Sequence, residues 1–540
     1  MERTPVRGSR AGRPSISQKS GRSTPLAVAC DDPRAIADLR TALTSGNYTV
    51  LGIRSALSTG EEFSSRPADI PVHLRRLPPD RPLSSLIKLF LLGFSVAADE
   101  SRRALAPASL DRLERLGLIE TSAATVRALV RLLPHDKLVV ACDRRPEPEA
   151  GELPADWVTG IDPPAVLLAN LTVRRPARTA LDVGTGCGIQ ALLAAQHSEQ
   201  VMAVDINPRA LSFVEFNRRL NGINNIECRQ GNLFEPVQGL SFDLIVCNPP
   251  YVISPEHDYV YRDSGLPGDR LCRRIIRDAP GFLNEDGFSH VLVSWVTRPT
   301  EDWSAPLRDW TTRSGCDTWL LHSSTEDPLT HAAKWNRPSV PAEFAAYSQT
   351  LDRWLDYYRH SGIEAIAFGA IIQRRHSGTA NWTRADELPA GSIRNAGDHV
   401  QRVFASQDYL SGLSTEQALL DGVLKVADGI RLEQAFTCRN RNWDLQQMTL
   451  KLEAGLQFVG GADALTARLL SIFDGRRPLR QVLQETAADE EVADSEQQAF
   501  TTAALPIVHR LIGLGFLVPI SHIARARAAQ DQPASSRRLP

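Results

Sequence analysis

The most constraining feature of the chain is an apolar run that stops at two consecutive prolines. Residues 242–247 read Phe-Asp-Leu-Ile-Val-Cys, a composition typical of a strand buried in a parallel sheet. Asn248-Pro249-Pro250-Tyr251 follows at once, and because proline cannot donate a ladder hydrogen bond, the strand must end there. Open α/β sheets bind ligands at the carboxyl ends of their strands, so these four residues are predicted to border a ligand site.

A glycine-rich turn upstream indicates what that ligand is. Residues 179–183 read as a strand, Gly184-Thr185-Gly186-Cys187-Gly188 as a tight turn, and the residues from Ile189 as a helix. A dinucleotide fingerprint would have its third glycine at Ile189. Asp182 just before the turn would repel a pyrophosphate but can meet a cationic amino group. The turn therefore favours a zwitterionic ligand such as S-adenosylmethionine over NAD.

Two further strand ends add polar groups to the same edge. Asp205 ends the strand 200–205, where a carboxylate can accept both hydrogen bonds of a ribose diol, and Ile206 is assigned to the same site. The alternative for Asp205 is a helix cap for residues 208–220. Asn232 follows the third strand and can bond an adenine amino group, or else serve only a turn.

The Asn-Pro-Pro-Tyr segment is predicted to be catalytic. The side-chain oxygen of Asn248 and a carbonyl of Pro249 or Pro250 can accept hydrogen bonds from an amino or amide N–H2 group. Those bonds would aim the nitrogen lone pair at a sulfonium methyl, so that catalysis is largely positioning. The Tyr251 ring can stack on a planar amide or base; the alternative is a packed tyrosine in a proline loop.

In this order of motifs the chain resembles the class I S-adenosylmethionine-dependent methyltransferases, and among them the N-methyltransferases with an N-P-P-Y motif. The resemblance covers about residues 155–376. Its nearest form is that of the release-factor glutamine methyltransferases, which share the 265–269 and 270–279 segments that follow the catalytic loop. The chain departs from that group at Asn232, where many members carry Asp, and in Trp157–Pro164. Similar loops occur in methyltransferases of nucleobase amino groups, so the motif leaves the substrate open.

The fold class predicted is α/β, with a parallel, doubly wound, Rossmann-like methyltransferase sheet between two smaller domains. The predicted divisions are a disordered basic tail at 1–30, a helical, winged-helix-like domain at 31–145, a linker at 146–154 and the methyltransferase domain at 155–376. An uncertain connecting region at 377–460, a small, helical, winged-helix-like domain at 461–520 and a disordered tail at 521–540 follow. In the N-terminal domain, strands are expected at 126–133 and 137–142. In the connecting region, helices are expected at 400–411 and 415–426.

The substrate is predicted to be a macromolecule, with an RNA nucleobase amino group favoured over a protein glutamine amide. Arg270, Arg273, Arg274 and Arg277 would share one helix side and could track phosphates, although a solvated charged face is the commoner explanation. Arg374-Arg375-His376 adds slightly to the RNA case. A third possibility is a binding protein that keeps the cofactor fold without turnover. His257-Asp258-Tyr259 is a candidate lid segment. Core or lid packing is the expected role of the tryptophans clustered between 295 and 354, and base stacking is the alternative.

Bulk properties exclude several other classes of protein. The net charge of −2 gives no whole-chain basic field for nucleic acid. The eight cysteines form no C-x-x-C pair or Cys/His cluster, which favours reduced thiols in a cytoplasmic protein and predicts no metal site. No apolar stretch is long enough to span a membrane, so no membrane partner is expected. The sequence leaves the oligomeric state open.

Overall fold

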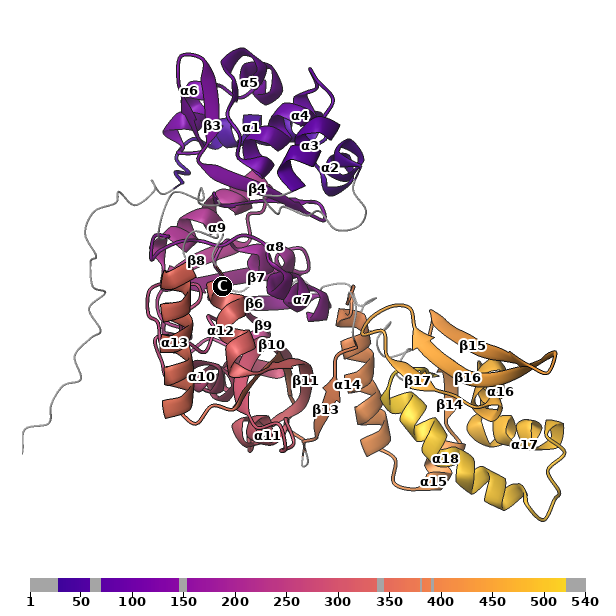
Figure 1. Cartoon of the computed structure of the whole chain (residues 1–540). Helices are drawn as coiled ribbons and strands as arrows, with labels where there is room; N and C mark the ends of the chain where they lie inside the picture. The colour runs from indigo at the N-terminus through magenta and orange to yellow at the C-terminus, as the bar shows by residue number, and fades with distance from the viewer. Residues whose placement is uncertain are drawn as a thin grey trace, which may run out of the picture.

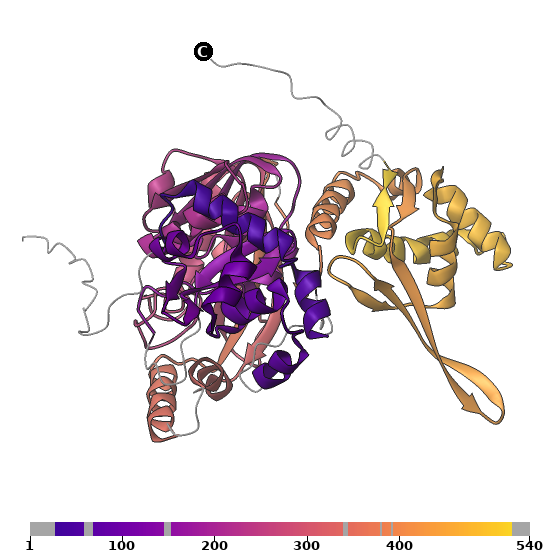
Figure 2. The same cartoon turned by 90° about the horizontal axis from the view of Figure 1, so that it is seen from above.

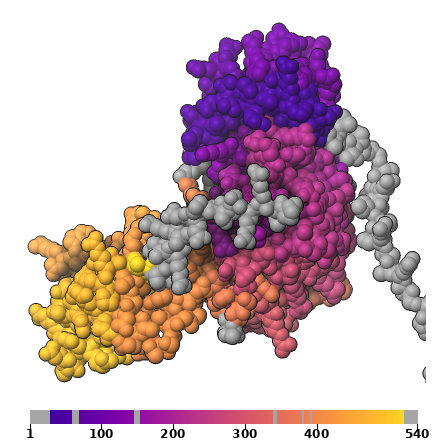
Figure 3. Space-filling view, turned by 180° about the vertical axis from the view of Figure 1, so that it is seen from behind, coloured from indigo at the N-terminus to yellow at the C-terminus, as the bar shows by residue number. Residues whose placement is uncertain are grey.

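The computed structural model describes residues 28–58, 69–144, 153–337, 344–378, 381–389 and 393–520. These residues form an N-terminal unit, a central sheet unit and a C-terminal unit, which follow one another in space as they do in the chain (Figures 1 and 3). Most of the predicted N-terminal tail, most of the linker and the C-terminal tail lie outside the described residues. The tail prediction is wrong at its end, because Val28 is buried in the core and Ala29 donates a backbone hydrogen bond to Leu116.

The central unit is built on an eight-stranded sheet with the order β13-β11-β12-β10-β9-β6-β7-β8. The strands are β6 (Ala177–Val183), β7 (Ser198–Asp205), β8 (Ile226–Gln230), β9 (Phe242–Cys247), β10 (Leu283–Thr297), β11 (Cys316–Glu326), β12 (Ala365–Arg375) and β13 (Thr383–Glu387). The expectation of an all-parallel sheet is wrong at one edge, since β12 runs antiparallel to both β10 and β11. The sheet also continues beyond residue 376, because β13 pairs in parallel with β11.

Helices cover both faces of this sheet, which explains why its central strands are apolar throughout. On β9, Leu244 and Val246 pack toward the face that carries α7 (Pro163–Leu171), α8 (Ile189–Ala194) and α9 (Pro208–Leu220). Ile245 and Cys247 pack toward the opposite face, with α10 (Arg270–Asp278) and α11 (Ala305–Thr311). With both faces buried, the strand ends are the places where polar side chains can gather.

The N-terminal unit has helices α1 (Pro33–Ser45), α2 (Val50–Leu57), α3 (Ile70–Arg76), α4 (Pro82–Leu86), a π-helical turn (Ile87–Leu92), α5 (Ala98–Leu105) and α6 (Leu110–Arg115). A small sheet joins β1 (Val96–Ala97), β3 (Thr125–Ala128) and β2 (Ile119–Thr121) in that order. The predicted strand 126–133 is in fact two strands. The chain leaves the small sheet at Leu129 and enters a separate hairpin, β4 (Val130–His135) and β5 (Leu138–Asp143).

That hairpin fastens the N-terminal unit to the central one. Asn217 on α9 accepts a hydrogen bond from the Ala141 backbone N–H at 2.7 Å and donates one to the Ala141 carbonyl at 2.9 Å. Asn221, one turn later, does the same with Val139. The two amides thus take the place of a neighbouring strand along the edge of β5, which leaves those backbone groups hydrogen-bonded.

The C-terminal unit begins with α14 (Gly397–Ser411), α15 (Glu416–Leu420) and β14 (Val423–Val426), so the helix expected at 415–426 is interrupted. Strands β15 (Ile430–Arg439), β16 (Asn442–Leu452) and β17 (Val459–Gly461) follow, and the β15–β16 hairpin projects from the unit (Figure 2). The remaining elements are α16 (Ala464–Ile472), β18 (Asp474–Pro478), α17 (Leu479–Asp489), α18 (Gln497–Gly513) and β19 (Leu517–Pro519). Because β14 pairs with β18 and β19, part of the predicted connecting region belongs to the same unit as 461–520.

A buried ion pair joins α14 to the central sheet. The Arg374 guanidinium, at the end of β12, donates to the carboxylates of Asp317 and Asp408. His376 completes a group whose ligand atoms lie within 4.8 Å of one another and could in principle hold a metal. The guanidinium already binds both carboxylates, so this cluster is an ionic anchor between units.

None of the described helices is both long and apolar enough to cross a membrane.

Candidate active site

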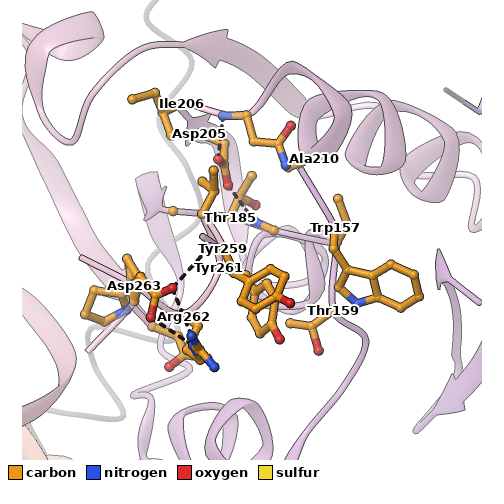
Figure 4. A pocket seen from close by; sticks show the side chains of 18 of the residues that line it. Trp157, Thr159, Thr185, Asp205, Ile206, Ala210, Tyr259, Tyr261, Arg262 and Asp263 are labelled. Carbon is orange, nitrogen blue, oxygen red and sulfur yellow. Dashed lines mark hydrogen bonds and ion pairs between the residues drawn. The ribbon is translucent and has the colours of Figure 1, made fainter. Parts of the chain in front are cut away.

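A cavity of about 470 Å³ opens at the carboxyl ends of β6, β7 and β9. Every residue assigned to the site from sequence lines this cavity, with the single exception of Gly188. Parallel strands bring their ends to one edge of the sheet, which is why residues far apart in sequence meet here. Figure 4 shows Asp205 and Ile206 at one end of the cavity in that view and Arg262 and Asp263 at the other.

The glycines of the turn after β6 have two different structural roles. Gly184 and Gly186 have φ angles of +70° and +55°, and a Cβ built on either would meet no atom within 4 Å. Both border the cavity, so a side chain there would take up space that a ligand can use. Gly188 has a φ of +86°, but its Cβ would lie 3.0 Å from Cγ2 of Val214 on α9. Helix packing therefore accounts for Gly188.

Asp205 is tied down by two backbone groups. Its carboxylate accepts hydrogen bonds from the N–H of Gly186 at 2.9 Å and of Asn207 at 2.9 Å. Burial raises its pKa. The helix-cap alternative is wrong, because the side chain of Asn207 caps α9 by accepting from the Arg209 N–H. Ile206 beside it is 56% exposed and borders the cavity, which leaves an apolar surface open to a ligand.

Asp182 lies at the floor of the cavity and is only 1% exposed. One of its oxygens accepts hydrogen bonds from the Thr185 hydroxyl at 2.7 Å and the Ala191 N–H at 3.0 Å. Burial raises its pKa to about 7. The carboxylate thus fixes the glycine turn to the start of α8. Its other oxygen makes no hydrogen bond to the residues that the structure describes.

Asn248 carries the clearest sign of a missing ligand. Its side-chain oxygen is buried, and within the described parts of the chain it has no hydrogen-bond partner. A buried acceptor without a partner is costly and uncommon in native proteins, so a bound N–H donor is the natural complement. Tyr251 packs at 5.0 Å from the Phe368 ring and at 6.4 Å, edge-on, from the Trp335 ring. Burial raises the pKa of Tyr251, which keeps the phenol neutral.

Asn232 shows the turn role that was its alternative, while still bordering the cavity. Its carbonyl accepts from the Glu235 N–H at 3.0 Å, and its amide nitrogen donates to the Glu235 carboxylate at 3.2 Å. The side-chain oxygen, which would face an adenine amino group, is not engaged by any described residue. The two interpretations of Asn232 are therefore compatible.

Two cavity walls were not foreseen from the sequence. One is the segment 155–162, held by the Val260 N–H, which donates to the Ala155 carbonyl at 3.1 Å, and by Asn207, which donates to the Asp156 carbonyl at 2.9 Å. The other is the loop after the catalytic motif, where only the His257–Tyr259 stretch had been suspected. The residues missed are Asp162 and Trp335 together with Trp157, Thr159, Tyr261, Arg262 and Asp263, of which Figure 4 labels the last five. Tyr261, an aromatic residue close after the motif, was the available signal.

The cavity is electronegative. Carboxylates border it at positions 156, 162, 182, 205 and 263, and its arginine, Arg262, is engaged by Asp263 through contacts of 2.8 and 3.1 Å. Such a lining attracts a cationic sulfonium or ammonium group and repels phosphates.

Three of the four arginines on the outer side of α10 pair with carboxylates. The helix forms as predicted, with Leu271, Cys272, Ile275 and Ile276 buried. On the other side, Arg273 and Arg277 both pair with Asp309 of α11, and Arg274 pairs with Asp278. With Arg374 also buried in its ion pair, these arginines fit a charged protein surface better than a phosphate track. The packing role expected of the tryptophans is confirmed for Trp295, Trp319 and Trp354, each fully buried.

Comparison with known sequences agrees with this geometry. Residues 159–298 match the family described as methyltransferase small domain. Over 144 residues the chain is 31% identical to a Methanocaldococcus jannaschii protein provisionally named as a protein N5-glutamine methyltransferase, covering 72% of that protein and 25% of this chain. The chain belongs to the N-P-P-Y class I S-adenosylmethionine-dependent methyltransferases. That family comprises N-methyltransferases with the α/β sheet described above.

For other methyltransferases the match covers a smaller share of the relative's own length. The ribosomal protein uL3 glutamine methyltransferase of Bordetella pertussis is 37% identical over 25% of this chain, which spans 50% of that relative. The release factor glutamine methyltransferase of Xylella fastidiosa strain Temecula1 is 42% identical over 22% of this chain and 47% of its own length. Residues 45–129 and 401–519 match two domains of unknown function, DUF7059 and DUF7782.

Solved structures add no argument beyond this. The crystal structure of Trm5b from Pyrococcus abyssi matches 47% of this chain and 61% of its own, at 16% identity and a TM-score of 0.28. A score that low carries nothing about function.

Proposed function

We propose that the chain transfers a methyl group from S-adenosylmethionine to the side-chain amide nitrogen of a glutamine in a protein. The observation that carries the proposal is the buried Asn248 oxygen, which has no partner among the described residues and belongs to a residue that lines the cavity. A primary amide supplies the N–H that this oxygen needs. The names of the matched relatives support the same acceptor.

The cavity residues fit the methyl donor. Asp205 can accept from the ribose hydroxyls, Ile206 can cover one face of the adenine, and the Asn232 oxygen can accept from its amino group. The open space beside Gly184 and Gly186 admits the rest of the molecule, near the Asp182 carboxylate. When bound, the donor supplies an electrophilic methyl: the acceptor nitrogen forms the N–C bond, the C–S bond breaks onto sulfur, and a proton leaves the nitrogen to solvent.

The catalytic motif then acts by placement. Asn248 accepts from one acceptor N–H, and a proline carbonyl of the motif accepts from the other, which turns the nitrogen lone pair toward the methyl. As positive charge develops on that nitrogen the N–H becomes a stronger donor, so the bond to Asn248 strengthens in the transition state. The neutral ring of Tyr251 supplies a flat surface for the planar amide.

Charge favours a protein acceptor over RNA. A nucleobase would bring its phosphates toward a cavity bordered by carboxylates, whereas a glutamine arrives on a neutral peptide backbone. Of the arginines that favoured RNA from sequence, Arg273, Arg274, Arg277 and Arg374 are engaged by Asp309, Asp278, Asp317 and Asp408.

Purified acceptors test the proposal. The enzyme is incubated with methyl-labelled donor and either ribosomal protein uL3, a peptide-chain release factor or total RNA from the same cells. We expect label in a protein, at a glutamine located by peptide mass spectrometry. Label in RNA alone would overturn the glutamine assignment, and label in no polymer despite donor binding would favour a cofactor-binding protein without turnover.

A further inference from the structure

The neighbouring strands β11 and β12 are joined by an unexpected helical insert. Adjacent antiparallel strands can be connected by a two-residue turn. Here residues 327–364 intervene, and they contain α12 (Pro328–Asn336) and α13 (Phe344–His360), which lie side by side against the central unit (Figure 1). Asp327 caps α12 by accepting from the Leu329 and Thr330 N–H groups. The presence of these two helices between neighbouring strands calls for an explanation.

The insert is bonded to the loop that leaves the catalytic motif. The Tyr358 hydroxyl donates to the Ile253 carbonyl at 2.9 Å, and His331 Nδ1 donates to that hydroxyl at 2.8 Å. Burial lowers the pKa of His331 to about 3, so the imidazole is neutral and its tautomer is fixed by this bond. Farther along the loop, Glu256 accepts from the Trp354 indole N–H and from the Arg353 guanidinium.

A small hydrophobic core of its own holds the same parts together. It contains Val252 and Ile253 from the loop, Trp354 and Tyr358 from the insert, and Ile366 from β12. Tyr251 and Trp335 pack against this core from the cavity side. The position of the Tyr251 ring therefore depends on the insert.

We infer that the insert forms the acceptor-side wall of the active site and that Trp335 is a specificity-determining residue that contacts the acceptor. Trp335 borders the cavity and meets Tyr251 edge-on, with ring centroids 6.4 Å apart and planes at 72°. Two rings at a right angle form a corner, in which a planar amide can stack on Tyr251 while its chain runs along the indole. The donor-side residues of β6 and β7 lie on other elements, so the two sides can be perturbed separately.

This inference rests on the proposed function, and steady-state kinetics of Trp335→Ala tests it with whichever acceptor takes label from the wild-type enzyme. Loss of an aromatic contact should raise KM for the acceptor about tenfold and leave the donor Kd within about twofold of wild type. Trp335→Phe should recover most of the wild-type KM. Lys334→Ala removes the neighbouring exposed side chain and its pair with Glu326, and should behave as wild type.

The outcomes separate the two proposals. An unchanged acceptor KM in Trp335→Ala, with the donor Kd also unchanged, overturns the acceptor wall and leaves the glutamine assignment standing. A rise in the donor Kd as large as the rise in acceptor KM also overturns it, since that would mean general damage to the site. If the wild type methylates RNA, the glutamine assignment fails while the KM ratio still decides the role of Trp335. If it methylates no polymer, both fail.

Discussion

Replacing Asn248 by alanine should separate activity from stability. In the acceptor-free enzyme the buried Asn248 oxygen has no partner among the described residues, and an unsatisfied buried acceptor costs about 1–3 kcal/mol. Its removal offsets the lost packing of a half-buried side chain, so the free energy of unfolding should fall by less than about 1 kcal/mol or should rise. Turnover loses a hydrogen bond that strengthens in the transition state, worth about 100- to 1,000-fold in kcat.

The assay combines urea unfolding, donor binding by calorimetry and initial rates at saturating donor. Asn225→Ala is the matched control, because its amide donates to the carbonyls of Ala195 at 3.0 Å and Ser198 at 2.8 Å, away from the cavity lining. The control should lose stability and keep its kcat. Turnover within a few-fold of wild type in Asn248→Ala, or a loss explained by unfolding, would refute the assigned role.

Three further changes address the donor side. Asp205→Ala should weaken donor binding about 10- to 100-fold with kcat at saturating donor nearly kept, as measured by calorimetry and rates; a kcat loss at unchanged Kd would contradict it. Gly186→Ala should raise the donor Kd. Gly188→Ala, whose Cβ would meet Val214, should mainly lower the melting temperature. If the two variants change the donor Kd and the melting temperature equally, the two glycines do not differ in role. Asp182 has a pKa raised from about 3.8 to about 7, so a cationic donor should bind up to about tenfold more weakly per pH unit below 7. Between about pH 4 and 7 the folded donor-free state keeps the Asp182 proton that the unfolded state has lost, so the free energy of unfolding should fall as pH rises. Asp182→Asn should flatten the pH profiles of donor binding and of stability. Profiles unchanged by this substitution would contradict the pKa shift.

The parts of the site that sequence could predict are those that local chemistry fixes. Asp182, Asp205 and Asn248 each stand at the end of an apolar strand, and parallel strands bring their ends to one edge. The identity of each residue and its place at a strand end were therefore enough to predict that Asp182, Asp205 and Asn248 share one site.

The parts that sequence could not predict depend on contacts between distant segments. The wall at 155–162 owes its place to Asn207 and Val260, and the Trp335 wall to an insert anchored on Ile253 and Glu256. Gly188 looked like a ligand glycine because its role, contact with Val214, lies outside its own turn. Strand pairing across the C-terminal unit likewise decided that residues 423–426 form a strand and not the end of a helix.

The arginines of α10 illustrate the same limit for the prediction of function. Their helical spacing was read correctly, yet whether they were available for phosphates depended on Asp309, a residue on another helix. Only the folded chain shows that Arg273 and Arg277 share the Asp309 carboxylate.

The most direct test of the central claim is the chemical identity of the methylated group. Cell extract is labelled by the enzyme with methyl-labelled donor, separated into protein and RNA, and the protein fraction is hydrolysed in acid. Side-chain amide methylation predicts label in protein that is released by hydrolysis as methylamine. Label that stays with nucleosides after nuclease digestion, and none released as methylamine, would contradict the account.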